Sequence, residues 1–232
     1  MRAFKTLSKL VLTFAVALFL VACADSESTT TSVSKPKKAT TIMIFGDSTS
    51  QGYGIEMLGT YYENVRPGTI YGDLLVTRLR DENIAEFAPI TVVNASLGSE
   101  FTSQAIDRLP SLLAAYRPTH VVLAHGTNDA GSGYPNSYMA GNFTTMINMV
   151  KKSGAKALLA DVTFTRYGTE FANAYSQMVF NTAVTTGATY VPILNGIAGN
   201  PAYYLEDGFH QNEAAQPFML NNLWAKLIPL LE

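Results

Sequence analysis

The sequence predicts an α/β fold in which a central parallel sheet of five strands is covered by helices on both faces. Two observations predict it. Short, wholly apolar runs recur along the chain from residue 42 onward, and segments with helical spacing separate them. Strands that are apolar throughout are buried on both faces, as in parallel sheets. The 232 residues, 47% of them hydrophobic, suffice for one such domain.

The five expected strands are short runs that end at glycine or polar residues. The first is stopped by Gly46, and the later ones repeat its pattern. They span residues 42–45, 91–94, 121–124, 157–160 and 190–193. In a sheet built this way, ligands bind beyond the carboxyl ends of the strands.

Apolar residues three or four positions apart predict the helices between these strands. They cover residues 71–80, 104–116, 138–152, 171–186 and 213–231. Pro110 lies inside the second of them and is expected to kink or break it. The segment of residues 52–72 is rich in tyrosine (Tyr53, Tyr61, Tyr62, Tyr71) and either walls a substrate cleft or packs as a surface excursion.

The first 22 residues have the layout of a secretory signal peptide. Arg2, Lys5 and Lys9 precede an apolar run over residues 10–21, which is too short to span a bilayer. The run ends in Leu-Val-Ala-Cys at Cys23, which resembles the lipobox of bacterial lipoproteins. We therefore expect a lipoprotein signal peptide over residues 1–22. A plain signal peptide with an incidental cysteine, or a core helix, is the alternative.

Residues 23–40 are expected to form a flexible tether, because this Ser/Thr/Lys-rich stretch has almost no large apolar residue to bury. The lipobox resemblance implies that Cys23 is acylated and holds the chain to a membrane of the bacterial cell envelope. Ala24 after the cysteine favours the outer membrane, although Asp25 leaves this open. One cysteine cannot close an intrachain disulfide, and a pI of about 5.9 argues against a nucleic-acid partner.

Polar motifs follow three of the expected strands, and a fourth lies near the C-terminus. They are Gly46-Asp47-Ser48, residues 94–99 (Asn-Ala-Ser-Leu-Gly-Ser), Gly126-Thr127-Asn128-Asp129, and Asp207-Gly208-Phe209-His210. Each has a structural alternative: Ser48 as a helix N-cap, Asn128 and Asp129 as turn residues, and Asp207 with His210 as a surface turn.

Together these motifs contain the groups of a serine hydrolase. The Ser48 hydroxyl needs an adjacent base, and the imidazole of His210 titrates near working pH. Asp207, three residues earlier, can accept the proton on the other ring nitrogen and fix the tautomer. His120 and His125 are not expected to be catalytic. His120 is expected to be a satisfied core or boundary histidine, and His125 to lie at the cleft. The three histidines do not cluster at metal-ligand spacing, so no metal is expected.

The motifs, in this order, resemble those of the GDSL, or SGNH, hydrolase family over residues 41–232. Residues 94–110, 167–176 and 207–218 are most similar to the bacterial thioesterase I/protease I/lysophospholipase (arylesterase) group. The resemblance implies a flavodoxin-like three-layer α/β/α sandwich. It also implies an oxyanion hole made by the Ser48 amide, an amide after the second strand and the Asn128 side chain. We expect Ser99 to give the second amide, with Gly98 as the alternative.

The resemblance further implies a carboxylic ester hydrolase that needs no cofactor. Its expected substrate is a small-molecule or lipid ester with a short-to-medium acyl or aryl group, a lysophospholipid or an acyl thioester. An O-acetylesterase acting on envelope or environmental polysaccharide is the alternative. A non-catalytic envelope lipoprotein on the same fold is a third possibility.

Overall fold

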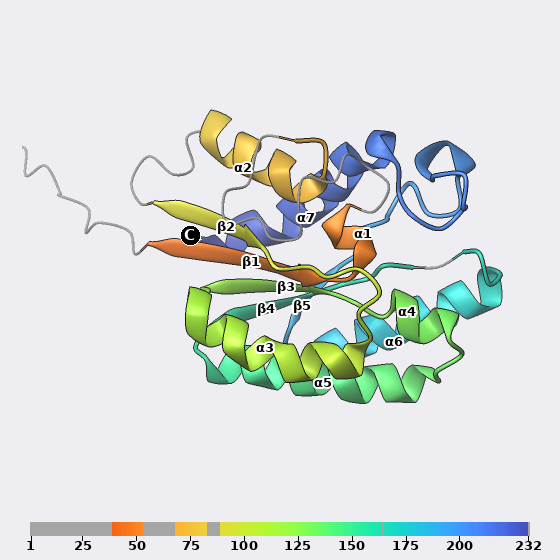
Figure 1. Cartoon of the computed structure of the whole chain (residues 1–232), viewed down its shortest axis with the longest axis horizontal. Helices are drawn as coiled ribbons and strands as arrows, with labels where there is room; N and C mark the ends of the chain where they lie inside the picture. Colours follow the sequence, from red (N-terminus) through yellow and green to blue (C-terminus); the bar gives the residue numbers. More distant parts are fainter. Residues whose placement is uncertain (1–38, 53–67, 83–88, 164, 232) are drawn as a thin grey trace, which may run out of the picture. The chain divides into compact units, whose positions relative to one another are not determined.

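The computed structural model describes residues 39–52, 68–82, 89–163 and 165–231. A parallel five-stranded sheet lies at its centre, with the strand order β2-β1-β3-β4-β5 (Figure 1). The strands are β1 (Thr40–Gly46), β2 (Ile90–Asn94), β3 (His120–Ala124), β4 (Lys156–Ala160) and β5 (Thr189–Val191). This is the flavodoxin-like order, and all five expected strands are confirmed. Strand β5 ends at Val191 because Pro192 has no N–H for the ladder.

Helices cover both faces of the sheet, which gives three layers. Figure 1 shows α2 (Tyr71–Asp81) and α7 (Gln216–Leu231) on one face. On the other lie α3 (Thr102–Tyr116), α5 (Asn136–Lys152) and α6 (Thr169–Thr186). The apolar runs of β1 and β3 are buried throughout, as expected for strands covered on both sides.

Of the two expected effects of Pro110 on α3, a kink or a break, the break does not occur. The helix runs without interruption from Thr102 to Tyr116, with Pro110 inside it and exposed. One missing backbone hydrogen bond is offset here by the packing of Leu109, Leu112 and Leu113, which are buried on the opposite face.

Two short helices, absent from the predicted pattern, follow the carboxyl ends of central strands. Helix α1 (Ser48–Gln51) comes directly after β1, and α4 (Thr127–Gly131) comes after β3. Since β1 and β3 are neighbours, these two turns lie side by side where the strand order reverses. Two short 3-10 helices, η1 (Pro201–Tyr203) and η2 (Glu213–Ala215), complete the described elements. Within the described residues, no helix is long and apolar enough to cross a membrane.

Candidate active site

Ser48 is the first residue of α1, at the carboxyl end of β1. The preceding residue, Asp47, caps this helix, since its Oδ1 accepts the Thr49 N–H at 3.1 Å. Asp47 is therefore the N-cap, and the alternative that Ser48 has this role is wrong. The Ser48 hydroxyl is left to face the loop that carries His210.

Ser48, His210 and Asp207 form a continuous hydrogen-bonded chain. Ser48 Oγ lies 2.9 Å from His210 Nε2, and His210 Nδ1 lies 2.7 Å from Asp207 Oδ2. An ionised carboxylate only accepts hydrogen bonds, so Nδ1 carries the proton and Nε2 presents its lone pair to the serine hydroxyl. This is the geometry in which a histidine can take the serine proton.

The Asp207 carboxylate is held by its own turn. Its Oδ1 accepts the backbone N–H of Phe209 at 2.8 Å and of His210 at 2.9 Å. Burial opposes ionisation, but the hydrogen bonds from the His210 ring and from these two amides outweigh it and hold the pKa of Asp207 below its ordinary value. Asp207 is thus ionised at neutral pH and fixes the orientation of the imidazole.

Asp47 joins the Ser48 turn to the Asn128 turn. Its Oδ2 accepts the Thr127 N–H at 3.3 Å and also the Thr127 hydroxyl. Burial raises the pKa of Asp47, against the lowering effects of His125 and of the bonds from Thr127 and Thr49. Gly126, at φ 112°, starts the Asn128 turn, and a Cβ there would lie 2.6 Å from Tyr175 Oη. Glycine is therefore required at this position.

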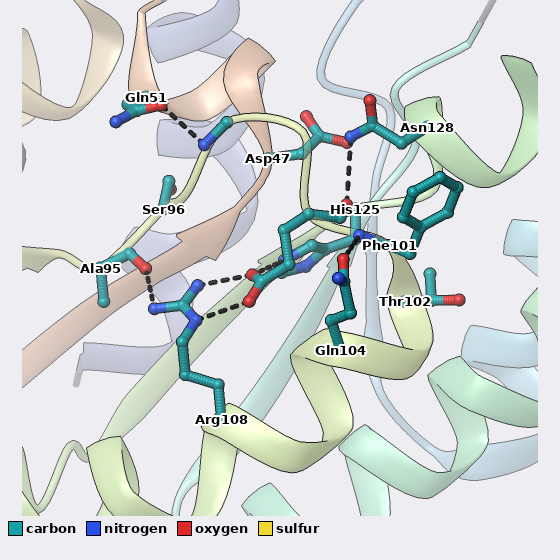
Figure 2. Close-up of polar contacts among 12 residues, drawn as sticks. Asp47, Gln51, Ala95, Ser96, Phe101, Thr102, Gln104, Arg108, His125 and Asn128 are labelled. Atoms are coloured by element: carbon teal, nitrogen blue, oxygen red, sulfur yellow. Dashed lines mark hydrogen bonds and ion pairs between the residues drawn. The ribbon is translucent and has the colours of Figure 1, made fainter.

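Asn128 lies in the first turn of α4, and its side-chain amide points toward the loop after β2 (Figure 2). Its Nδ2 donates to the backbone oxygen of Glu100 at 3.0 Å. An amide nitrogen carries two hydrogens, and among the described residues Nδ2 has no second acceptor. Asn128 thus has one amide hydrogen left for a ligand, and it lies in the turn that Asp47 joins to the Ser48 turn.

The loop after β2 presents the Ser99 amide rather than the Gly98 amide. The Gly98 N–H donates to the Gln51 side-chain oxygen at 2.7 Å, so it is already used. Within the described residues, the Ser99 N–H donates to no protein acceptor. Ser99 adopts φ 64°, a left-handed conformation that is uncommon for a residue with a Cβ. The geometry therefore favours Ser99 over Gly98 as an oxyanion donor.

Several residues at the site carry no recognisable sequence signal. Gln51 holds Gly98, and Glu100 and Arg108 form a bidentate ion pair. His125 was expected at the cleft, but it is fully buried against the Phe45 ring and bonds to Glu100. That expectation is wrong, because His125 continues the buried run of β3 and the chain turns only at Gly126. His120, by contrast, is a satisfied core histidine, bonded to Thr119 and to the Leu230 carbonyl.

Most of the tyrosine-rich segment, residues 53–67, lies outside the described residues. Tyr71 is described and does not wall a cleft. It is fully buried, and its hydroxyl donates to Ser50 Oγ at 2.7 Å. For this tyrosine, the packing alternative is the correct one.

Two open grooves include residues of the site. One, of about 600 Å³, lies beside the Ser99 amide between Leu97, Gln104 and Arg108. The other, of about 570 Å³, lies beside Asp207 and includes Arg166 and Tyr204. Among the side chains that the structure describes, no group of three or more His, Cys, Asp or Glu residues is placed to hold a metal ion.

The fold and the site define a serine-hydrolase type of protein on a flavodoxin-like scaffold, and comparison with known proteins agrees. Residues 44–216 match the model of the GDSL-like lipase/acylhydrolase family, so the chain belongs to that family. It is a carboxylic ester hydrolase by class.

Individual relatives are named as esterases and thioesterases. The chain is 32% identical over 195 residues to an esterase TesA of Pseudomonas aeruginosa, covering 83% of this chain and 90% of that one. It is 26% identical to a thioesterase 1/protease 1/lysophospholipase L1 of Escherichia coli, covering 83% of this chain and 86% of that one. A crystal structure of TesA superposes with a TM-score of 0.72 at 31% identity, covering 82% of this chain and 99% of that one.

Proposed function

We propose that this chain hydrolyses carboxylic esters and thioesters through an acyl-enzyme on Ser48. His210 Nε2 takes the hydroxyl proton as Ser48 Oγ attacks the acyl carbon. The resulting oxyanion is stabilised by the N–H groups of Ser48 and Ser99 and by Asn128 Nδ2. When the intermediate collapses, His210 returns its proton to the leaving alcohol or thiol.

Deacylation follows the same course with water as the nucleophile. His210 removes a proton from water, the hydroxide attacks the acyl carbon, and the second tetrahedral intermediate releases the acid and regenerates the Ser48 hydroxyl. Asp207 remains ionised throughout and stabilises the imidazolium formed in each half-reaction. No cofactor enters this scheme.

The observation that carries the proposal is the chain of two short hydrogen bonds, 2.9 Å from Ser48 to His210 and 2.7 Å from His210 to Asp207. Their partners come from opposite ends of the sequence, 162 positions apart for Ser48 and His210. The Asn128 amide and the Ser99 N–H lie on two further segments. All of these residues follow strands of the same parallel sheet or lie on the loop that Ser48 contacts, which supports a common site for the nucleophile, the base and the donors.

Short-to-medium acyl and aryl esters are the substrates we favour, together with lysophospholipids and acyl thioesters. The names of the relatives support this class. The groove beside Ser99 is open and contains Leu97, an exposed apolar side chain, next to polar Gln104 and charged Arg108. Such a groove suits an ester with a short apolar part and a polar remainder.

An O-acetylesterase acting on polysaccharide is the second candidate, favoured by exposed aromatic rings near Asn128. Tyr134 stacks on Tyr138 with ring centroids 4.9 Å apart, and Phe101 meets Tyr134 edge-on. Both tyrosines keep 37% or more of their surface exposed. Aromatic faces of this kind can stack on sugar rings.

The two candidates are separated by assaying one series of substrates. Purified protein from residue 39 onward is given p-nitrophenyl esters of increasing chain length, lysophospholipid, acyl thioester and acetylated xylan, with Ser48→Ala and His210→Ala as controls. We expect turnover of the acyl and aryl esters, lost in both variants. Turnover of acetylated xylan only, reduced by Tyr134→Ala, favours the second candidate. Equal hydrolysis by wild type and both variants refutes the Ser48 assignment.

We further propose that the chain is a lipoprotein, acylated at Cys23 and held at the cell envelope, with the outer membrane favoured by Ala24. The support is the basic and apolar pattern of residues 1–22 and the lipobox-like end; these residues lie outside the described ones. Metabolic labelling with a tagged palmitate tests this. Label in the full chain that Cys23→Ala abolishes supports the anchor, and a labelled Cys23→Ala protein contradicts it.

A further inference from the structure

A buried charged cluster lies directly behind the oxyanion loop, which we define as residues 95–100. The Arg108 guanidinium forks onto the Glu100 carboxylate, with Nε at 2.6 Å and Nη2 at 2.5 Å. His125 Nε2 reaches the same carboxylate at 2.9 Å. The exposed fractions are 3% for the Glu100 side chain, 18% for Arg108 and 0% for His125. Figure 2 shows the Arg108 and His125 side chains pointing toward one another.

This cluster closes the oxyanion loop on itself. Arg108 Nη1 donates to the backbone oxygen of Ala95 at 2.8 Å, while the rest of its guanidinium holds Glu100. The first and last residues of the loop are thereby tied to one planar group on α3. Between them, Gln51 fixes the Gly98 N–H. The loop is pinned on both sides of Ser99.

Glu100 also orients the second donor of the proposed oxyanion hole. The Glu100 backbone oxygen accepts a hydrogen bond from Asn128 Nδ2 at 3.0 Å. Glu100 is also the residue directly after Ser99, so the two residues share a peptide bond. The position of Glu100 therefore sets the Ser99 peptide and the Asn128 amide together. Ser99 needs such restraint, because its left-handed conformation is one that a serine readily leaves.

The Glu100 carboxyl is held in its charged form. Burial opposes ionisation, but the hydrogen bonds and charges of Arg108 and His125 outweigh it, and the pKa of Glu100 lies below its ordinary value. Facing the carboxylate are Arg108 and His125, with buried Asp47 on the far side of the histidine. Because the ionised Glu100 carboxylate only accepts hydrogen bonds, His125 Nε2 carries a proton and is the donor in this contact.

We propose that Glu100, held by Arg108 and His125, is a positioning residue for the oxyanion hole. It touches neither substrate nor the reacting atoms. It acts by fixing where the Ser99 N–H and Asn128 Nδ2 point before the oxyanion forms. The inference rests on the proposed function, since it presupposes that these two donors stabilise a tetrahedral intermediate.

A positioning role and a merely structural role predict different kinetics. Oxyanion contacts strengthen in the transition state, so displaced donors lower kcat and leave KM nearly unchanged. Loss of general stability instead lowers the amount of folded enzyme and leaves the kcat of the remaining active sites intact. The affinity for a trifluoromethyl ketone, whose Ser48 adduct carries an oxyanion, should fall in parallel with kcat.

The test compares Glu100→Gln with Glu82→Gln. Glu82 is the matched control, because it also pairs with an arginine, Arg78, but it lies at the C-terminal end of α2 with 44% of its side chain exposed. Both variants are assayed with p-nitrophenyl butyrate and a trifluoromethyl ketone after active folded enzyme is quantified by near-UV circular dichroism. We expect Glu100→Gln to lower kcat and ketone affinity by about 10- to 100-fold with KM changed less than about 3-fold. Glu82→Gln should match wild type.

If Glu100→Gln does not fold, Arg108→Lys, which keeps the positive charge but not the fork, provides the same comparison. Wild-type kcat and ketone affinity in a folded variant would overturn the inference. So would a loss of activity confined to KM. Failure of the proposed function is visible separately, because in that case wild type and Ser48→Ala hydrolyse the ester equally.

Discussion

Asp73 is a buried carboxylate whose removal should stabilise the protein at neutral pH. It lies in the first turn of α2 and is 7% exposed. Among the described residues its Oδ1 has no hydrogen-bond partner. Burial raises the pKa of this carboxyl from 3.8 to about 6. Between pH 3.8 and about 6, the Asp73 carboxyl is therefore protonated in the folded protein but ionised in the unfolded chain.

The sign and the size of the effect follow from this shift. Below pH 3.8 both states are protonated, and Asp73 has no effect of this kind. As pH rises from 3.8 to about 6, the free energy of unfolding of the wild type falls, because the unfolded chain loses this proton first. Above about pH 6 both states are ionised, and the loss of stability stays constant. Two pKa units correspond to about 3 kcal/mol. A carboxylate near a helix N-terminus regains up to about 1 kcal/mol, so we expect a net gain of about 2 kcal/mol for Asp73→Asn.

Urea unfolding of Asp73→Asn and wild type at pH 4 and pH 8 measures this gain. At pH 8, the free energy of unfolding should be about 2 kcal/mol higher for Asp73→Asn than for wild type, which corresponds to a Tm about 4–8 °C higher in thermal unfolding. At pH 4 the difference between the two proteins should be much smaller. Asp107→Asn, at an exposed position on α3, is the control and should show no such pH-dependent difference. An equal gain at both pH values, or none at pH 8, would refute the reasoning.

Three further predictions concern the site. Asp207→Asn should lower kcat by about 10³- to 10⁴-fold, because the His210 tautomer is no longer fixed. The same variant should be less stable than wild type above pH ~4, and this difference should vanish in acid, because the pKa of Asp207 is lowered in the folded protein. Asn128→Ala should lower kcat by about 10²- to 10³-fold with little change in KM, measured on p-nitrophenyl butyrate; an unchanged kcat excludes Asn128 from the oxyanion hole. Ser99→Gly should keep activity and gain about 0.5–1 kcal/mol in urea unfolding, since it relieves a left-handed serine; a marked loss of stability would contradict this.

Much of the fold could be predicted because its signals are local. The buried strands appear as apolar runs, and the covering helices appear as periodic patterns. The start of α3 shows where this stops. At Thr102, the first residue of the helix, Asp129 from a different segment accepts both the N–H and the hydroxyl, in addition to the local bond from the Phe101 N–H to Gln104. A cap supplied from 27 positions away leaves no local pattern.

The candidate site divides in the same way. Ser48, Asn128, Asp207 and His210 each occur in a short motif. Hydrogen bonds join Ser48, His210 and Asp207, and Asn128 lies in the turn that Asp47 links to the Ser48 turn. Glu100 could not be found, because its partners are 8 and 25 positions distant and lie on different elements. The choice between Gly98 and Ser99 depends on the side chain of Gln51, which only the three-dimensional arrangement brings to that loop. Residues that position other residues are recognised by their contacts rather than by their spacing.

The central claim, that Ser48 is an acylated nucleophile activated by His210, is tested most directly by covalent labelling. A p-nitrophenyl alkylphosphonate reacts with an activated serine and releases one nitrophenol for each active site. We expect one phosphonyl group per chain on the peptide that contains Ser48, complete loss of hydrolysis, and no label in Ser48→Ala or after acid denaturation. A label on any other residue, or hydrolysis that survives full labelling of Ser48, would contradict it.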